Sequence, residues 1–245
     1  MGTPLDLLSM AQTVELAEGA MASGQHIQQV VINVAKLVNM RSDPDLHQDV
    51  LQSDIINIDG MGILWAARLL GHKARERVAG IDLMEALIAG CARHGYQPYF
   101  LGASEVVLQR AMARLRSDYP ALRIAGCRSG YFTQAEEEQV VADIRDSGAH
   151  CLFVAISSPM KERFLRRHRD HLGVPFLMGV GGSLDVVAGQ VRRAPPWMRQ
   201  TGLEWLYRLI QEPRRMWRRY LVTNTIFLGL LLAELGRTWL SPKKP

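Results

Sequence analysis

The chain of 245 residues has little cysteine. Its three thiols, Cys91, Cys127 and Cys151, are odd in number and far apart in the sequence. This pattern excludes a disulfide framework and a zinc site with paired ligands, and we expect small, buried apolar residues in a reducing compartment. The first residues lack the basic region and apolar stretch of a secretory signal, and Asp6 stands where a myristoylation motif needs Ser or Thr. An exported protein is therefore not expected.

Several catalytic motifs are also missing. No Asp-x-Asp pair follows an apolar run and the histidines lack the spacing of metal ligands, so neither a catalytic metal nor another cofactor is expected. The absence of a G-x-S-x-G elbow argues against a hydrolase of that type. Segment 178–185, Met-Gly-Val-Gly-Gly-Ser-Leu-Asp, resembles a dinucleotide fingerprint, but Leu184 replaces its third glycine. A nicotinamide-dependent enzyme is thereby disfavoured.

An excess of positive over negative charge is absent except near one end of the chain. From Arg192 onward there are eleven Lys or Arg and three acids, a formal balance of +8, whereas the preceding residues balance at −3. A polyanionic partner should therefore meet the C-terminal fifth. Nucleic acid and anionic lipid are both candidates, and a merely solvated helical face is the alternative.

Apolar runs alternate with amphipathic stretches along most of the chain. The runs predict strands at 30–32, 55–58, 99–101, 122–124, 151–156 and 175–180. Apolar residues at three- and four-residue spacing predict helices at 83–93, 105–118 and 134–146. The alternation predicts an α/β fold around a mainly parallel sheet.

Most predicted strands end in turn-forming or polar residues, at Asn33, 59–60, 102–104, 157–159 and 181–183. In open parallel sheets the ligand crevice lies outside the carboxyl ends of the strands, so these positions can converge. The glycines at 179–182 suit a phosphate or nucleotide loop, because they let backbone N–H groups approach an anion. A simple tight turn explains them equally well.

Asp59 follows an apolar run directly and precedes Gly60. An acid held half-buried there can have its pKa raised toward values useful for a general base. Asp is also a preferred N-cap residue, and the segment 61–70 reads as a helix. Spacing alone does not separate the two interpretations.

The character of the chain changes after Trp197. Segment 214–220, Arg-Arg-Met-Trp-Arg-Arg-Tyr, precedes a run at 221–235 that is almost wholly apolar. This run is shorter than a membrane span and interrupted, so a basic helix lying in the membrane interface fits better. The alternative is a helix packed on the domain. We divide the chain into a core, 1–195, and a helical C-terminal membrane-docking appendage, 196–245.

An ordered set of short segments resembles the WecG/TagA/CpsF glycosyltransferases, glycosyltransferase family 26. The segments are Asp-Gly-Met-Gly at 59–62, Arg-Val-Ala-Gly-Ile-Asp at 77–82, Phe-Leu-Gly at 100–102, Gly-Tyr-Phe at 130–132, Ser-Pro-Met-Lys-Glu at 158–162, Gly-Gly-Ser-Leu-Asp at 181–185, Arg-Ala-Pro at 193–195 and Gly-Leu-Glu-Trp-Leu-Tyr-Arg-Leu at 202–209. The likeness extends from about residue 33 to 220.

The resemblance implies an inverting, metal-independent enzyme with a Rossmann-like core, located in the cytoplasm and peripheral on the inner face of the cell membrane. The implied donor is a UDP-sugar, and the implied acceptor is a polyprenyl-diphosphate-linked saccharide of surface or exopolysaccharide assembly. Carried over by motif, Asp59 is the implied catalytic base, Arg77 its companion and Asn33 a sugar contact. Arg208, Arg215 and Arg218 match appendage arginines that close over diphosphates, and attraction to lipid headgroups is their alternative role. We place Arg208 with the site and the later arginine cluster with the membrane. The remaining implied substrate-binding residues are Gly102, Tyr131, Ser158, Lys161, Glu162, Gly181, Gly182 and Asp185.

Two departures from the family pattern bear on the donor sugar. Lys161 stands where the family usually has glutamine, and Val31 stands where it usually has threonine. An amide and a hydroxyl are lost and a cation is gained, which disfavours N-acetylmannosamine and favours an anionic sugar near Lys161. The rival interpretations are a non-catalytic nucleotide-sugar or polysaccharide-binding protein and a nucleic-acid-binding protein. The apolar run at 221–235 favours membrane over nucleic acid, and the sequence leaves a homo-oligomer open.

Overall fold

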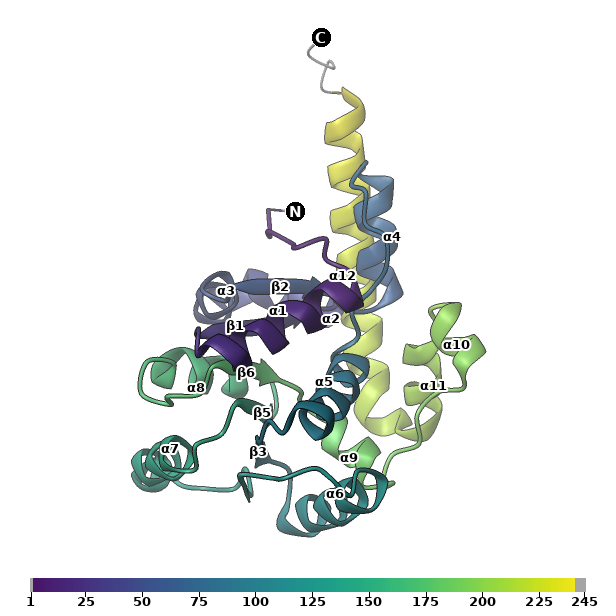
Figure 1. Ribbon diagram of the computed structural model, residues 1–245. Helices are drawn as coiled ribbons and strands as arrows, with labels where there is room; N and C mark the ends of the chain where they lie inside the picture. The colour runs from purple at the N-terminus through teal and green to yellow at the C-terminus, as the bar shows by residue number, and fades with distance from the viewer. Residues whose placement is uncertain (1, 241–245) are drawn as a thin grey trace.

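The computed structural model describes residues 2–240, except for the side chains of Arg215 and residues 238–240 (Figure 1). Its centre is a six-stranded sheet with the strand order β2-β1-β6-β5-β3-β4. All the strand pairs are parallel. The strands are β1 (Ile27–Ile32), β2 (Ile55–Ile58), β3 (Pro98–Gly102), β4 (Gly126–Arg128), β5 (Cys151–Ala155) and β6 (Phe176–Gly179). The predicted α/β class and mainly parallel sheet are confirmed.

Helices cover both faces of the sheet. On one face, Phe100, Phe153 and Phe176 pack under α1 (Met10–Ser23), α5 (Gly80–His94) and α6 (Glu105–Asp118). The other face carries α2 (Val34–Ser42), α3 (Pro44–Leu51) and α4 (Met61–Leu69) over β1 and β2, and α7 (Glu137–Asp146) and α8 (Met160–His168) over the rest. Alternate strand residues face opposite layers, so β3, β5 and β6 each contribute to two clusters of the core.

The sequence predicted most of these elements, with one strand misplaced. The apolar residues at 122–124 do not form a strand, because Leu122 instead packs into the core beneath the helices. Pairing with β3 begins only at Gly126, opposite Tyr99. A Cβ at Gly126 would lie 2.5 Å from Cε2 of the Tyr99 ring, so glycine leaves the room that this ring occupies. The thiols of Cys91 and Cys151 are buried as expected, whereas Cys127 on β4 is partly exposed.

The topological switch point of the sheet lies at the carboxyl ends of β1 and β6, which are neighbours in the strand order. Helix α2, which follows β1, packs on one face of the sheet. The short helix α9 (Ser183–Val187), which follows β6, contacts α6 on the other face. The chain therefore leaves two neighbouring strands in opposite directions, which is the arrangement that opens a ligand crevice in parallel sheets.

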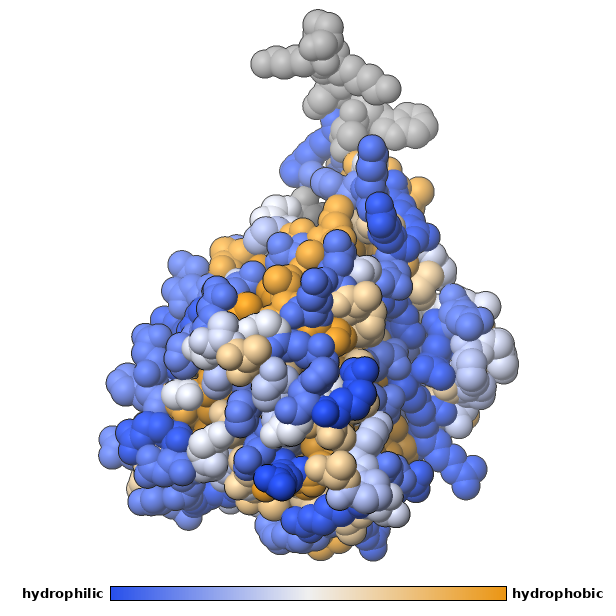
Figure 2. All heavy atoms as spheres, in the orientation of Figure 1, coloured by the Kyte–Doolittle hydropathy of each residue, from blue (hydrophilic) through white to orange (hydrophobic). Residues whose placement is uncertain are grey.

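The C-terminal part forms α10 (Pro196–Gln200), α11 (Glu204–Gln211) and α12 (Pro213–Leu240). Helix α12 packs along α2, and its Phe227 and Leu231 are buried in the cluster with α4. None of the helices in the described part of the chain is long and apolar enough to cross a membrane. In Figure 2, hydrophobic residues on the visible face gather around the N-terminal segment that precedes α1.

Candidate active site

Backbone hydrogen bonds bring three predicted site residues to one edge of the sheet. Ile32 and Ile58 are paired at the ends of β1 and β2, and the next residues are Asn33 and Asp59. The N–H of Asp59 donates to the carbonyl of Ile32 at 2.8 Å, and the N–H of Val78 donates to the carbonyl of Ile58 at 2.7 Å. The second bond fixes the loop that carries Arg77 beside the end of β2. Residues distant in sequence therefore converge as predicted.

The side chain of Asp59 does not cap the helix that follows it. Helix α4 begins at Met61, its N-cap position is Gly60, and no side chain accepts a capping hydrogen bond there. Gly60 has a φ of 86°, a conformation that costs glycine little and allows the sharp turn out of β2. The interpretation of Asp59 as the N-cap of α4 is therefore wrong. Asn33, at the end of the neighbouring strand, does cap the helix that follows it, α2, because its side chain accepts from the N–H of Lys36 at 3.0 Å.

The half-buried carboxyl of Asp59 lies in a strongly charged neighbourhood. Removal from water raises the pKa of Asp59 above its ordinary value, and the nearby carboxylate of Glu204 raises it further. The cationic side chains of Arg77, Arg208 and Lys36 oppose this shift. A carboxyl in such a setting holds a proton more readily than an ordinary aspartate, which is what a general base at neutral pH requires.

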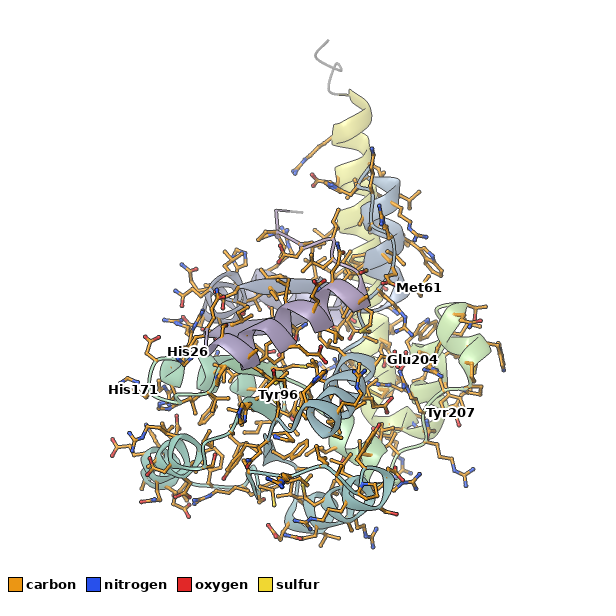
Figure 3. All side chains as sticks on the ribbon, in the orientation of Figure 1. His26, Met61, Tyr96, His171, Glu204 and Tyr207 are labelled. Carbon is orange, nitrogen blue, oxygen red and sulfur yellow. The ribbon has the colours of Figure 1, made fainter. Side chains whose placement is uncertain are left out.

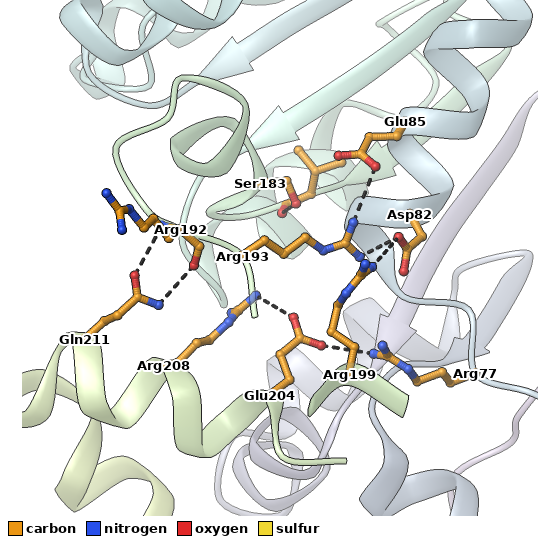
Figure 4. Close-up of polar contacts among 11 residues, drawn as sticks. Arg77, Asp82, Glu85, Ser183, Arg192, Arg193, Arg199, Glu204, Arg208 and Gln211 are labelled. Carbon is orange, nitrogen blue, oxygen red and sulfur yellow. Dashed lines mark hydrogen bonds and ion pairs between the residues drawn. The ribbon is translucent and has the colours of Figure 1, made fainter. Parts of the chain in front are cut away.

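Glu204 on α11 joins two arginines of this site (Figure 4). Arg77 donates to Oε2 of Glu204 at 3.2 Å, and Nη2 of Arg208 lies 3.5 Å from Oε1. Helix α11 begins beside the start of α4, because Gly202 packs so closely on Met61 that a Cβ would lie 2.9 Å from it (Figure 3). The predicted placement of Arg208 with the site agrees with this geometry.

A second ionic cluster holds the segment that precedes α11 against α5. Arg193 donates to Asp82 and lies 3.4 Å from Glu85, and Arg199 lies 3.6 Å from Asp82 (Figure 4). The two acids stand in the first turns of α5, so the arginines fasten residues 193–199, which include most of α10, to the start of α5. Burial is the main reason that the pKa of Glu85 is raised.

Lys36, Lys161 and Glu162 form a buried triad between α2 and α8. Nζ of Lys36 lies 2.8 Å from Oε1 of Glu162 in an ion pair that is not aligned as a hydrogen bond, and Nζ of Lys161 donates to the same oxygen. The two lysines hold the pKa of Glu162 at about 2 against the opposing effect of burial. Burial lowers the pKa of Lys161 to about 7. The contact of Lys161 with an anionic sugar stays a prediction, since the ammonium lies buried against Glu162.

Glycines shape the neighbouring strand ends. At Gly102, φ is 134° and a Cβ would lie 2.4 Å from the carbonyl of Ala155, so β3 and β5 can approach only with glycine there. A Cβ at Gly179 would lie 3.0 Å from the stem of Lys161. Gly181, with a φ of 54°, makes the turn from β6, and Gly182 occupies the N-cap position of α9, whose first turn contains Asp185. The glycine segment thus forms a tight turn at the carboxyl edge of the sheet.

The other predicted residues lie on the surface, outside these ionic clusters. Tyr131 is 84% exposed, and Ser158 and Arg218 are also exposed. The side chain of Arg215 lies outside the described residues. Among the residues that the structure describes, no three His, Cys, Asp or Glu side chains gather as metal ligands.

Two residues of the site, Lys36 and Glu204, were not predicted from the sequence. Lys36 stands among apolar neighbours on the buried face of α2, three residues after Asn33. Glu204 precedes Arg208 by one helical turn, the spacing of an ion pair. Both features are visible in the sequence. They do not indicate a site, however, until the fold brings Lys36 beside Glu162 and Glu204 beside Asp59.

One comparison with known families agrees with this arrangement. The family model described as "Glycosyl transferase WecG/TagA/CpsF family" matches residues 1–240, nearly the whole chain. The match spans the sheet, the charged site at its carboxyl edge and the helix that carries Glu204 and Arg208. With its parallel Rossmann-like sheet and the charged side chains at the carboxyl edge of that sheet, the chain belongs to the WecG/TagA/CpsF family of glycosyltransferases.

Proposed function

We propose that this glycosyltransferase moves a sugar from a UDP-sugar to a polyprenyl-diphosphate-linked saccharide, with inversion at the anomeric carbon. The observation that carries the proposal is the half-buried Asp59, whose pKa is raised, within a site that also contains Arg77 and Arg208. The pathway served is the assembly of a bacterial surface polysaccharide or exopolysaccharide. The protein works in the cytoplasm, on the inner face of the cell membrane.

In this mechanism Asp59 takes the proton of the acceptor hydroxyl. The hydroxyl oxygen attacks the anomeric carbon as the bond from that carbon to the UDP oxygen breaks, and attack on the face opposite UDP inverts the configuration. Asp59 becomes a neutral acid and UDP leaves with the bonding electrons. A pKa raised by burial helps the carboxylate accept this proton.

The arginines stabilise the negative charge that develops on the leaving UDP. Guanidinium groups donate paired hydrogen bonds that match phosphate oxygens, and Arg77 and Arg208 are the cations held at the site by Glu204. Preorganised cations stabilise a leaving diphosphate without a metal ion. We therefore expect transfer to continue in excess EDTA, and a loss of activity that magnesium or manganese restores would contradict this part of the proposal.

The apolar tail of the acceptor requires a membrane, and α12 provides the contact in this proposal. One face of the helix is buried on α2, while Leu221, Leu228 and Leu232 remain between 55% and 61% exposed. Arg214, Arg218 and Arg219 are exposed at its beginning. Basic and apolar side chains together are what an anionic membrane surface attracts.

Asp59→Asn tests the chemistry. The change removes proton acceptance but keeps the shape, so single-turnover transfer to a synthetic lipid-diphosphate sugar should fall about 10²–10⁴-fold. Thermal melting and UDP affinity should stay near those of the parent. Asp118→Asn, which alters an exposed ion pair with Arg114 at the end of α6, is the matched control and should leave transfer unchanged.

Near-parental transfer by Asp59→Asn would show that Asp59 is not the general base. A non-catalytic sugar-binding protein would bind a UDP-sugar without releasing UDP in the presence of any acceptor. A screen of UDP-sugars with the lipid-linked acceptor therefore separates the two functions and identifies the donor at the same time.

A further inference from the structure

Glu204 is a carboxylate in a place where an anionic ligand would be expected. Its two oxygens face different arginines, with Arg77 at Oε2 and Arg208 at Oε1. The side chain is 19% exposed, and α11, on which it stands, contains no fully buried residue. Glu204 is therefore held by charge more than by packing, and it can leave the arginines without opening the core.

We propose that Glu204 is an internal stand-in for the diphosphate of the donor. In the free enzyme it occupies the position between Arg77 and Arg208, and the diphosphate of an incoming UDP-sugar replaces it. This inference rests on the proposed function, because it takes the donor to be a nucleoside diphosphate sugar.

The chemistry of the exchange favours the diphosphate. A carboxylate offers a single negative charge to the two guanidinium groups, whereas a diphosphate offers at least two charges and more acceptor oxygens. Arg208 is 51% exposed and its 3.5 Å contact is longer than a good hydrogen bond, so little is lost when it releases Glu204. The stand-in keeps the two cations facing one another across the site while no donor is bound.

The exchange also involves Asp59. The charged groups that face Asp59 are Lys36 from α2, Arg77 from the loop before α5, and Glu204 and Arg208 from α11. Of these, only Glu204 carries a negative charge and favours the protonated form of Asp59. Removing that charge should lower the pKa of Asp59 in the free enzyme.

Glu204→Gln tests both consequences. Isothermal calorimetry should show UDP binding about three- to tenfold tighter than to the parent, the gain expected when a competing partly exposed ion pair is removed. The acid limb of the pH profile of kcat/KM, which reports the free enzyme, should move to lower pH. Glu204→Asp keeps the charge, so its acid limb should stay in place while its shorter side chain competes less well and UDP affinity rises by a smaller factor.

The matched control is Glu138→Gln on α7, which removes the charge of an exposed glutamate and should change neither measurement. If Glu204 only fastened α11 to the core, Glu204→Gln would bind UDP more weakly or equally; that result overturns the inference while the parent still binds UDP. A parent that does not bind UDP at all overturns the inference and the proposed function together. Should the Gln variant fail to fold, unchanged UDP affinity in Glu204→Asp is sufficient to refute it.

Discussion

Lys36 and Glu162 meet 2.8 Å apart although they belong to different helices, and each side chain is at most 5% exposed. Both helices begin at the carboxyl edge of the sheet, α2 after β1 and α8 after β5. Lys161 donates to the same carboxylate, so Glu162 is the shared partner of two buried lysines. Such a cluster is stable only while each charge has a partner.

Replacing Glu162 by Gln should therefore destabilise the fold strongly. The change leaves the buried ammonium of Lys36 without a counter-charge, and breaking a buried pair in this way costs about 3–5 kcal/mol. Urea unfolding of the parent and the variant at pH 7 measures the effect. Glu138→Gln on the exposed side of α7 is the control and should change stability by less than about 0.5 kcal/mol; a similarly small loss for Glu162→Gln would mean that the triad is not a structural anchor.

The same carboxylate predicts how stability depends on pH. The pKa of Glu162 is lowered from its ordinary 4.5 to about 2 in the folded protein. Its contribution is complete above about pH 4.5 and is lost as the pH falls from there toward 2, a total of about 3 kcal/mol for a shift of this size. The parent and Glu162→Gln should therefore converge in stability through this window. Parallel unfolding curves over the same range would refute the prediction, because other carboxylates titrate equally in both proteins.

Gly102→Ala should be destabilising at the junction of β3 and β5. The new Cβ would lie 2.4 Å from backbone atoms of Ala155, and the φ of 134° is one that alanine rarely adopts. Backbone strain of this kind costs about 1–3 kcal/mol before the steric clash is added. Gly19→Ala is the matched control, since it stands within α1 with open space around it and should stabilise the helix by up to about 1 kcal/mol. Thermal melting of both variants compares them, and equal melting temperatures would contradict the clash.

The sequence predicted those parts of the fold in which local pattern and packing agree. The strand at 55–58 and the helix at 105–118 have the bounds observed, because a run of buried β-branched residues and a regular apolar stripe each specify one structure. The pattern failed at 122–124, where apolar residues pack into the core outside the sheet. The short strand β4 has only partly buried residues, so it leaves little hydrophobic signal.

The site was predictable to the extent that parallel strands bring their carboxyl ends together. That rule brought Asn33, Asp59 and the glycine turn to one edge. It could not indicate that Lys161 would lie buried beside Glu162, or that Glu204 would join Arg77 and Arg208, because these contacts depend on how α8 and α11 pack. Sequence patterns specify the elements, whereas the charge balance at Asp59 arises from their tertiary arrangement.

The structure also determines how the proposed membrane contact is best tested. Removing α12 would uncover the apolar cluster on α2 and α4, because Phe227 and Leu231 are buried there. Replacing Leu221, Leu228 and Leu232 by Asn instead changes one exposed stripe, since spacings of seven and four residues keep these positions on the same side of a helix.

The triple variant should fold like the parent and lose most of its membrane binding. Each leucine withdrawn from a membrane forfeits up to about 1.5–3 kcal/mol of apolar burial, so binding to anionic liposomes should fall about a hundredfold or more. The exposed arginines of α12 remain and contribute about 1 kcal/mol each near an anionic surface, so the residual binding should disappear on zwitterionic liposomes or at high salt. Flotation with vesicles measures membrane binding, and thermal melting measures folding.

Val106→Asn on α6 is the control, because it replaces an equally exposed apolar side chain outside α12 and should float like the parent. Unchanged flotation of the triple variant would show that this face of α12 is not what holds the enzyme at the membrane.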